Sequence, residues 1–335
     1  MLFGKGYKLG FLSCFVRHKN ILEVTDLSSS VWRRLIKRSI YFGKNRNKNF
    51  SSLRGKQVGL FFDSASLRTK LSFEIATHKL GGFPYFMDIH SVTHEDGETR
   101  ESFGDIIDTA DRFVDMYVVR DYSRKILDVL KRDTFPPVIN GFSVVGHPSQ
   151  ALADLAVITR EKGDVRKLSV CAVCPAEGSG VIESFVYGVL LLDGNVTLIT
   201  PTGKFVGKND DFRDVVGKLP GKLYIEKDPR RVIKKADVLY VDEWWWPGSD
   251  FLKKRPSKKY RVDRDFLKDS KADLIILHCL PAHHNREISE QVILSKKSLV
   301  FDEAEFRVYS AMALMEYLAE GVSKPRKFFS QEREG

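Results

Sequence analysis

The stretch Val58-Gly-Leu-Phe-Phe-Asp-Ser-Ala-Ser-Leu-Arg-Thr-Lys70 passes from an apolar run, through a polar turn, into a helical pattern. The apolar run predicts a buried strand, and a helix is expected over about 70–79. Free backbone N–H groups at a helix start attract an anion, and Ser66, Thr69 and the guanidinium of Arg68 can add donors. The turn therefore predicts a phosphate-type site, although a capped helix start with a surface arginine would have the same local pattern.

Outward from this stretch, β-rich runs alternate with helical patterns, which is typical of parallel α/β architecture. In the first half, helices are expected over about 101–113 and 151–159, and a strand over 116–120. In the second half, a last helix is expected over about 308–319, and strands are expected at 168–173, 195–199, 222–225, 238–241, 274–277 and 298–301.

The chain has 335 residues, which is more than one compact core usually spans, so two domains are expected. The predicted fold class is α/β, with two doubly wound parallel-sheet domains joined by connecting helices. The boundary between them is expected near 150–165, in a connecting helix.

The net charge of +10 could attract nucleic acid or small anionic substrates. No aromatic-plus-basic motif of a nucleic-acid module occurs, so we expect no nucleic-acid partner. We also expect no membrane partner, because no apolar run approaches the roughly 20 residues that cross a bilayer. The basic leader before Glu23 resembles an organelle-targeting segment but lacks a clear small-residue cleavage site. The cytoplasm is therefore the expected compartment, with an organelle as the alternative.

The four cysteines (Cys14, Cys171, Cys174 and Cys279) form no disulfide framework, which suits a reducing compartment. The pair Cys171-Ala-Val-Cys174 has the spacing of a metal or redox motif. In a strand, however, residues three apart point to opposite faces, so the two thiols would diverge. We expect both thiols to pack in the core.

Three further segments place polar side chains near the carboxyl ends of predicted strands, where open α/β sheets bind their ligands. Arg120 ends one strand, His147-Pro-Ser-Gln150 opens a helix, and His278-Cys-Leu-Pro281 follows another strand. Each alone could be structural, as a salt-bridged arginine, a capping histidine or a buried cysteine. Together with the turn that contains Arg68, they predict one shared site.

These segments resemble the aspartate/ornithine carbamoyltransferase family. Phe62-Asp-Ser-Ala-Ser-Leu-Arg-Thr-Lys-Leu-Ser-Phe-Glu74 looks like its carbamoyl-phosphate signature, and His147-Pro-Ser-Gln-Ala-Leu-Ala-Asp-Leu155 is similar to its second signature. His278-Cys-Leu-Pro-Ala282 and Phe301-Asp-Glu-Ala-Glu-Phe-Arg307 match the ornithine branch. The resemblance runs from about residue 17 to residue 320, with the motifs in the family's order.

The resemblance implies a carbamoyltransferase without a cofactor, with its active site between two domains. Residues 1–155 would bind carbamoyl phosphate, with 1–16 as a leader that could be disordered, and residues 156–310 would bind the acceptor amino acid or amine. Residues 311–335 would form a C-terminal helix that packs back on the first domain, followed by a tail. The partners implied are carbamoyl phosphate, a small amine or amino acid, and further copies of the chain in a homotrimer or a multiple of trimers.

The family's chemistry is the attack of a neutral amine on the carbonyl carbon, followed by loss of phosphate from a tetrahedral intermediate. The developing oxyanion needs donors already in place, and the leaving phosphate needs fixed positive charge. The resemblance implies catalytic roles for Arg120, His147, Cys279 and Arg307. It implies that carbamoyl phosphate is bound by Ser66, Leu67, Arg68, Thr69, Arg120, His147, Gln150, Cys279, Leu280 and Arg307, and the acceptor by Asp242, Trp246, Pro247 and Ser179.

The chain departs from the family pattern in two places. Leu67 replaces a threonine, which removes one hydroxyl donor worth about 0.5–1.5 kcal/mol. Trp246-Pro247 stands where the ornithine branch has Ser-Met, and the segment 178–181 lacks an asparagine that holds the amino acid. The expected acceptor is ornithine or an ornithine-like amine, with putrescine, lysine or acylated ornithine as alternative acceptors. The alternative function is that of a non-catalytic paralogue that binds an anion. The tryptophans 244–246 either contact a cationic amine or pack at a domain edge.

Two other enzyme classes have weaker support. We expect no metal site, because His278, Cys279, His283 and His284 have no second ligand cluster beside them. A dinucleotide site is suggested by Gly178-Ser-Gly180 after a strand, but the third glycine of that fingerprint is missing.

Overall fold

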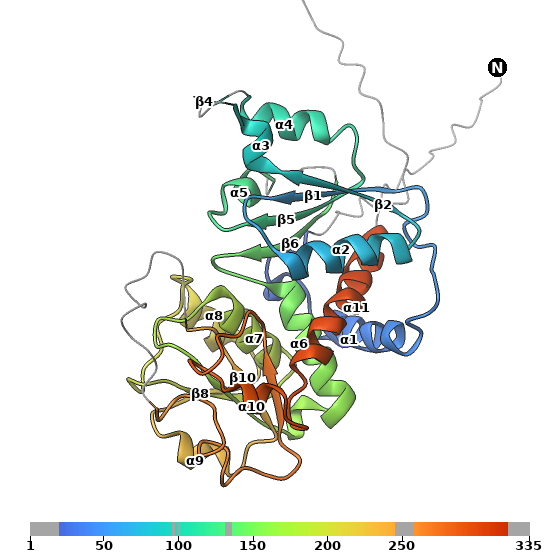
Figure 1. The fold of residues 1–335 in the computed structure, drawn as a ribbon. Coiled ribbons are helices and arrows are strands. Elements are labelled where there is room, and N and C mark those ends of the chain that lie inside the picture. The colour runs from blue at the N-terminus through green and yellow to red at the C-terminus, as the bar shows by residue number, and fades with distance from the viewer. Residues whose placement is uncertain (1–19, 96–97, 100, 131–135, 245–257, 321–335) are drawn as a thin grey trace, which may run out of the picture.

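The computed structural model describes residues 20–95, 98–99, 101–130, 136–244 and 258–320. The first half of the chain forms a parallel sheet with the strand order β2-β1-β5-β6 (Figure 1). Its strands are β1 (Gln57–Phe62), β2 (Phe83–Asp88), β5 (Met116–Asp121) and β6 (Val138–Ser143). Around it lie η1 (Val24–Asp26), α2 (Leu67–Lys79), α3 (Ile89–Thr93), α4 (Phe103–Ala110), α5 (Lys125–Leu130) and the short antiparallel pair β3 (His94–Glu95) and β4 (Glu98–Thr99).

The second half forms another parallel sheet, with the order β11-β10-β7-β8-β9. Its strands are β7 (Ser169–Val173), β8 (Asn195–Ile199), β9 (Leu223–Glu226), β10 (Val238–Val241) and β11 (Ile275–His278). The associated helices are η2 (Val165–Lys167), α7 (Gly180–Leu191), α8 (Phe212–Lys218), α9 (Pro229–Ile233) and α10 (Glu290–Ile293). Two parallel-sheet α/β units confirm the predicted fold class.

Three helices pack against one another where the two halves of the chain meet. They are α1 (Ser29–Lys44), α6 (Pro148–Lys162) and α11 (Val300–Ala319). Helix α6 joins β6 to β7, and α11 packs against α6, α1 and α2, so the blue and red ends of the described chain lie side by side (Figure 1). One continuous apolar cluster contains residues of both halves, including Val118, Leu155, Phe185 and Leu314. The two α/β units therefore share a single hydrophobic core.

Two predictions about individual elements were wrong or incomplete. The expected strand at 298–301 is not a strand: only Ser298 makes an isolated bridge, to Ile276, and helix α11 begins at Val300. The side chain of Phe301 is exposed, so the apolar run at this helix start does not indicate a buried strand. Strand β2 was not predicted, because it is an edge strand whose side chains are mostly exposed and it contains Pro84.

The sequence Cys171-Ala-Val-Cys174 lies at the end of β7, and both thiols are buried. Cys174 belongs to the large cluster shared by the two halves, whereas Cys171 belongs to a second cluster with Val173 and Leu239. The two thiols therefore face opposite sides of the sheet, as predicted. Within the part of the chain that is described, no helix is both long enough and apolar enough to cross a bilayer.

Helix α7 begins in very close contact with the loop that leads to His147. A Cβ atom at Gly180, the first residue of α7, would lie 2.5 Å from the backbone N of Gly146 and 2.7 Å from the backbone O of Val144. Backbone atoms cannot move away from such a contact unless the loop itself shifts. The absence of a side chain at Gly180 thus allows one unit to pack against the other at this point.

We expect Gly180→Ala to lower the free energy of unfolding by about 1–3 kcal/mol, because overpacking displaces the loop at 144–146. Gly217→Ala is the matched control, since a Cβ atom there meets no atom within 4 Å and the position is helical and exposed. This control should be neutral or gain about 0.5–1 kcal/mol. Urea unfolding of both variants measures the difference. Equal changes in the free energy of unfolding for Gly180→Ala and Gly217→Ala would contradict the close contact between Gly180 and the loop at 144–146.

Candidate functional site

The N-terminus of α2 lies beyond the carboxyl end of β1, where the sequence predicted an anion site. Ser66 is the N-cap residue, and its Oγ accepts a hydrogen bond from the backbone N of Thr69 at 3.3 Å. The first-turn N–H groups of Leu67 and Arg68 have no partner within a helix by its geometry. The Leu67 side chain is 70% exposed, so this residue can offer a ligand its backbone N–H only.

His147 links this helix start to three other elements. It is the N-cap residue of α6, and its backbone N donates to Ser184 Oγ in α7 at 2.8 Å. Its ring Nε2 lies 3.3 Å from Nη2 of Arg307, which in turn donates to Thr69 Oγ1 at 2.8 Å. Because a guanidinium only donates, Nε2 is the acceptor, and Nδ1 carries the proton that faces Ser149 Oγ at 3.2 Å. Burial and the nearby arginines lower the pKa of His147 well below its ordinary value, so the ring is neutral.

Three arginines (Arg68, Arg120 and Arg307) lie near His147 at the start of α2, and all three have lowered pKa values. Burial and the positive charge of Arg68 lower the pKa of Arg120 and of Arg307 to about 10. Burial also lowers the pKa of Arg68. These shifts show that the cations lie close together in a region where water cannot screen their repulsion.

The hydrogen bonds of the three arginines do not neutralise them. Arg120 Nε donates to Ser64 Oγ at 3.2 Å, and its guanidinium lies 4.2 Å from the ring centroid of Phe142. Arg307 contacts the neutral groups of Thr69 and His147, and Arg68 Nε is buried without a hydrogen-bond partner among the described residues. An anion bound at the start of α2 would relieve the repulsion and supply the missing acceptor.

A second, acidic group of residues comes from the second sheet. Asp242 follows β10 and is 1% exposed, and its Oδ2 accepts from Ser179 Oγ, the N-cap of α7, at 3.0 Å. Burial raises the pKa of Asp242 to about 8 and that of Glu243 to about 7. Glu243 lies 3.0 Å from Nε2 of His283, and its charge also acts on Arg68. The acidic groups therefore lie next to the arginine cluster and favour a cationic ligand beside an anionic one.

The segment after β11 contributes Cys279 and Leu280 next to both groups. Burial and the charge of Asp242 raise the pKa of Cys279 well above its usual value, so the thiol stays protonated. Leu280 has a φ of 55°, in the left-handed region, and its backbone N donates to His278 Nδ1 at 2.9 Å. The proton of His278 is then on Nε2, which lies 3.3 Å from Glu287 Oε1. His278 and Glu287 thus hold Leu280 in a backbone conformation that is unfavourable for leucine.

Gln150 is buried one turn into α6, and its amide nitrogen is shared between two carboxyl groups. Its Nε2 donates to Asp154 Oδ1 at 2.8 Å and to Glu303 Oε1 at 2.7 Å. Glu303 Oε2 accepts from the backbone N of His278 at 2.8 Å, which ties α11 to the end of β11. Gln150 Oε1 is buried and has no hydrogen-bond partner among the described residues.

Most of the residues predicted from the sequence lie in this region. Hydrogen bonds or charge interactions connect Ser66, Arg68, Thr69, Arg120, His147, Gln150, Cys279, Leu280 and Arg307, and Ser179 contacts Asp242. Trp246 and Pro247 lie outside the described residues. Trp244 is buried, with its ring centroid 6.3 Å from that of Tyr260, which favours the packing alternative for this one residue.

The sequence did not single out Asp154, Glu303, Ser64 or Glu287. Asp154 lies four residues after Gln150, and Glu303 four residues before Arg307, so each shares a helix face with an expected ligand. This i,i+4 spacing is the signal that could have found the first two. In the described part of the chain, no group of three or more His, Cys, Asp or Glu side chains is arranged to hold a metal ion.

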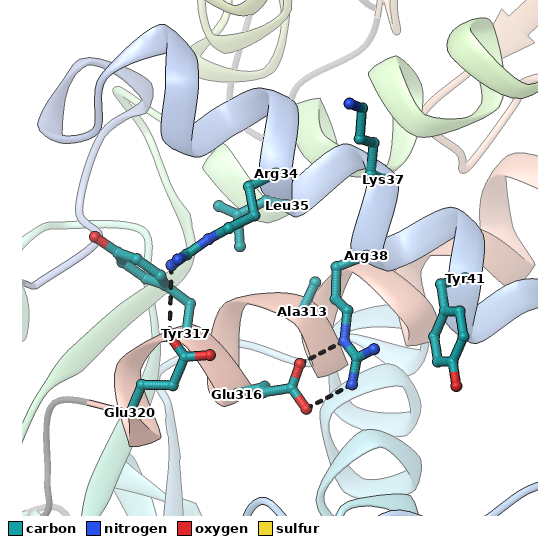
Figure 2. Close-up of a pocket in the computed structure, with 9 residues that line it drawn as sticks. All are labelled: Arg34, Leu35, Lys37, Arg38, Tyr41, Ala313, Glu316, Tyr317 and Glu320. Carbon is teal, nitrogen blue, oxygen red and sulfur yellow. Dashed lines mark hydrogen bonds and ion pairs between the residues drawn. The ribbon is translucent and has the colours of Figure 1, made fainter.

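An open cavity of ≈ 440 Å³ lies elsewhere, between α1 and α11 (Figure 2). It is also rich in basic side chains, but Arg38 pairs with both carboxylate oxygens of Glu316, with distances of 2.5 and 2.9 Å. This pairing raises the pKa of Arg38, whereas the pKa values of Arg120 and Arg307 are lowered. The anion-attracting cluster is therefore the one at the start of α2, and not the cavity.

Comparisons with known proteins match both halves of the chain. Residues 19–160 match the model of the carbamoyl-phosphate binding domain of aspartate/ornithine carbamoyltransferases, and residues 166–318 match the model of their aspartate/ornithine binding domain. The chain is 33% identical to the ornithine carbamoyltransferase of Methanocaldococcus jannaschii, an alignment that covers 90% of this chain and 99% of that protein.

Two further comparisons agree with these matches. A catabolic ornithine carbamoyltransferase of Thermoplasma volcanium is 32% identical, over 89% of this chain and 97% of that protein. The solved ornithine carbamoyltransferase of Pyrococcus furiosus superimposes with a TM-score of 0.78 at 29% identity, covering 89% of this chain and 96% of that one. The buried arginine cluster and the matches over both halves lead to one conclusion: the chain belongs to the aspartate/ornithine carbamoyltransferase family.

Proposed function

We propose that the protein transfers the carbamoyl group of carbamoyl phosphate to the side-chain amino group of ornithine, or of an ornithine-like amine, and releases phosphate. The observation that carries this proposal is the cluster of Arg68, Arg120 and Arg307 at the start of α2, beside buried carboxyl groups. The cluster suits a phosphate-bearing donor, and the acidic side suits a cationic acceptor. The relatives named ornithine carbamoyltransferase support the same choice.

In this proposal, residues 1–155 bind the donor. The phosphate accepts hydrogen bonds from the side chains of Ser66, Arg68 and Thr69 and from the backbone N–H of Leu67. Arg120, His147 and Arg307 face the carbamoyl group. The guanidinium groups of Arg120 and Arg307 are fixed donors for the negative charge that develops on the carbonyl oxygen, and His147 Nε2 holds Arg307 in place by accepting its hydrogen bond. The amine nitrogen bonds to the carbonyl carbon, the bond from that carbon to the phosphate oxygen breaks, and the leaving phosphate accepts the amine's proton.

Residues 156–310 bind the acceptor in this proposal. Asp242, fixed by Ser179, is mostly protonated in the empty site and ionises when a cationic group of the acceptor binds beside it. Cys279 and the backbone of Leu280 lie between the acceptor and the carbamoyl group. Trp246 and Pro247 are assigned to the same acceptor site. Putrescine, lysine and acylated ornithine remain alternative acceptors because the Trp246-Pro247 segment differs from the family pattern. Holding donor and acceptor together then supplies much of the acceleration.

An acceptor screen tests the proposal. The protein is incubated with carbamoyl phosphate and each of ornithine, lysine, putrescine and N-acetylornithine, and the carbamoylated product is measured together with released phosphate. We expect ornithine to give citrulline at the highest kcat/KM. In Arg68→Gln, both transfer and phosphate binding should be lost while the free energy of unfolding is unchanged or higher, because one of three repelling cations is removed. Phosphate binding without transfer to any amine would support a non-catalytic paralogue instead.

The buried Asp242 predicts a pH dependence of stability. Its pKa is about 8 in the folded protein and about 3.8 in an unfolded chain, so the folded state binds more protons between these values. The stability of the protein relative to Asp242→Asn should therefore fall as pH rises from about 4 to about 8, by up to about 1.4 kcal/mol per pH unit.

Urea unfolding at pH 6 and pH 8 measures this difference. Asp273→Asn serves as the control, because this carboxylate is exposed, pairs with Lys162 at 2.9 Å and has a lowered pKa, so it is ionised at both pH values. If the free energy of unfolding changes equally with pH in Asp242→Asn and in the unchanged protein, the pKa of Asp242 is not raised.

We propose that the chain assembles as a homotrimer or a multiple of trimers. The outer face of α2 carries Leu67, Leu71 and Ile75 at helical spacing, and the neighbouring edge strand β2 exposes Phe86, whose ring centroid lies 3.7 Å from Lys70 Nζ of α2. Exposed apolar patches of this kind mark contacts between proteins. A threefold ring joins this patch of one chain to a different patch of the next.

Sedimentation velocity tests the assembly. The unchanged protein should sediment at three times the mass of the chain or a multiple of it, and Leu71→Asp combined with Ile75→Asp should give monomers. The control is Leu294→Asp, which changes an equally apolar side chain that is 70% exposed on the second unit. If only Leu294→Asp dissociates the oligomer, the contact between chains involves the second unit and not the α2 patch.

The compartment and pathway follow from the same proposal. Cys171, Cys174 and Cys279 are free thiols, which suits the cytoplasm. Citrulline produced from ornithine would be available for arginine biosynthesis, whereas the Thermoplasma volcanium relative is named a catabolic ornithine carbamoyltransferase.

A further inference from the structure

The amide of Gln150 is held in one orientation by the two groups that accept its hydrogen bonds. Its Nε2 has two hydrogens, and these are directed to Asp154 Oδ1 at 2.8 Å and Glu303 Oε1 at 2.7 Å. Ionised carboxylates only accept hydrogen bonds. If the amide were flipped, Gln150 Oε1 would face both carboxyl groups, and at most one of them could offer it a proton.

The two carboxyl groups can coexist in this buried place because they need not both be charged. Burial raises the pKa of Asp154 to about 7, although a hydrogen bond with Glu303 lowers it. Burial and the charge of Asp154 raise the pKa of Glu303 well above its ordinary value. The positive charge of Arg307 lowers both pKa values slightly. A pair that keeps one proton is stable there, and it still presents an acceptor to each amide hydrogen.

The other end of the amide is left without a partner. Gln150 Oε1 is buried and accepts no hydrogen bond among the described residues, which typically costs about 1–3 kcal/mol. The amide lies within one helical turn of His147 along α6, and Glu303 lies one turn from Arg307 along α11. Asp154 lies one turn further along α6 and holds the NH₂ group, so the oxygen end of the amide is available to a donor bound near the helix start.

We propose that Asp154 and Glu303 are positioning residues that fix the Gln150 carboxamide with its oxygen toward the carbamoyl site, and that this orientation selects a donor substrate with an NH₂ group. This inference rests on the proposed function and deepens it. The NH₂ of carbamoyl phosphate can donate to Gln150 Oε1, whereas the methyl group of acetyl phosphate, similar in size, leaves that oxygen unpaired. A site built around an N–H donor rejects analogues that lack it.

Two unreactive ligands test the selection directly. Phosphonoacetamide and 2-oxopropylphosphonate share a phosphonate and a carbonyl and differ only in NH₂ against CH₃. By calorimetry, we expect the unchanged protein to bind phosphonoacetamide about 10- to 100-fold more tightly, as one hydrogen bond to a buried acceptor implies. A preference below about threefold in the unchanged protein would overturn the inference without any variant.

The double variant Asp154→Asn with Glu303→Gln tests the two positioning residues. Each new side chain has almost the same shape and carries both a donor and an acceptor, so Gln150 is free to take either orientation. We expect the preference for phosphonoacetamide to fall to about threefold or less. Inorganic phosphate should bind at least as tightly as before, because the variant loses negative charge that acts on Arg68 and Arg307. An equal loss for all three ligands would indicate a merely structural role, and a full preference would overturn the proposal.

Glu305→Gln is the matched control, because it lies on the same helix, is exposed and contacts Tyr309 and Arg46 instead of Gln150. It should change none of the affinities. The proposed function is tested separately by the unchanged protein. If that protein neither binds phosphonoacetamide nor transfers a carbamoyl group, the proposed function fails, whereas active protein with an undiminished preference in the double variant excludes only the positioning.

Discussion

The repulsion among Arg68, Arg120 and Arg307 constrains most of the site. These guanidinium groups come from α2, β5 and α11, and each lies where burial prevents water from screening its charge. Their hydrogen bonds reach only neutral groups such as Ser64 and Thr69. Nearby carboxyl groups, such as Asp63 beside Arg120 and Glu303 beside Arg68, offset part of the repulsion. The free energy stored in this repulsion is released when an anion binds. The fold thus keeps the three cations close together before the donor binds.

Helices α6 and α11 explain how such an arrangement persists. Each carries a pair of site residues at i,i+4 spacing, with Gln150 and Asp154 on α6 and Glu303 and Arg307 on α11. Both helices also belong to the apolar cluster shared by the two sheets, so their polar faces are anchored by the same packing that stabilises the fold. The site is therefore as rigid as the core behind it.

Sequence patterns were sufficient for most of the fold, because its strands are short apolar runs between clear helical segments. Strand β8 has the predicted bounds, and α2 follows the predicted polar turn but begins at Leu67, earlier than the expected start near residue 70. The expected strand at 298–301 failed because a short apolar run does not distinguish a buried strand from a helix start, and Phe301 in fact faces solvent. The edge strand β2 lacks the apolar continuity that identified the others.

The candidate site was predictable only as a set of separate segments. The family resemblance indicated Gln150, but its contact with Glu303 joins residues 153 positions apart, and local spacing carries no information about such a pair. The lowered pKa values of the arginines likewise depend on burial and on distances between elements. A sequence pattern can suggest which residues bind an anion, but not which neutral groups they contact or which carboxyl groups share a proton.

The position of α11 in the chain also bears on the biogenesis of the protein. The ribosome makes Arg68, Arg120 and His147 well before residues 300–319, yet the apolar cluster behind the first sheet includes α11 side chains such as Phe306 and Leu314. The first unit therefore cannot complete its core while the second is still being synthesised. Its apolar surface must stay exposed for that interval, about 10 to 30 seconds at typical elongation rates, which is a period in which a nascent chain depends on chaperones.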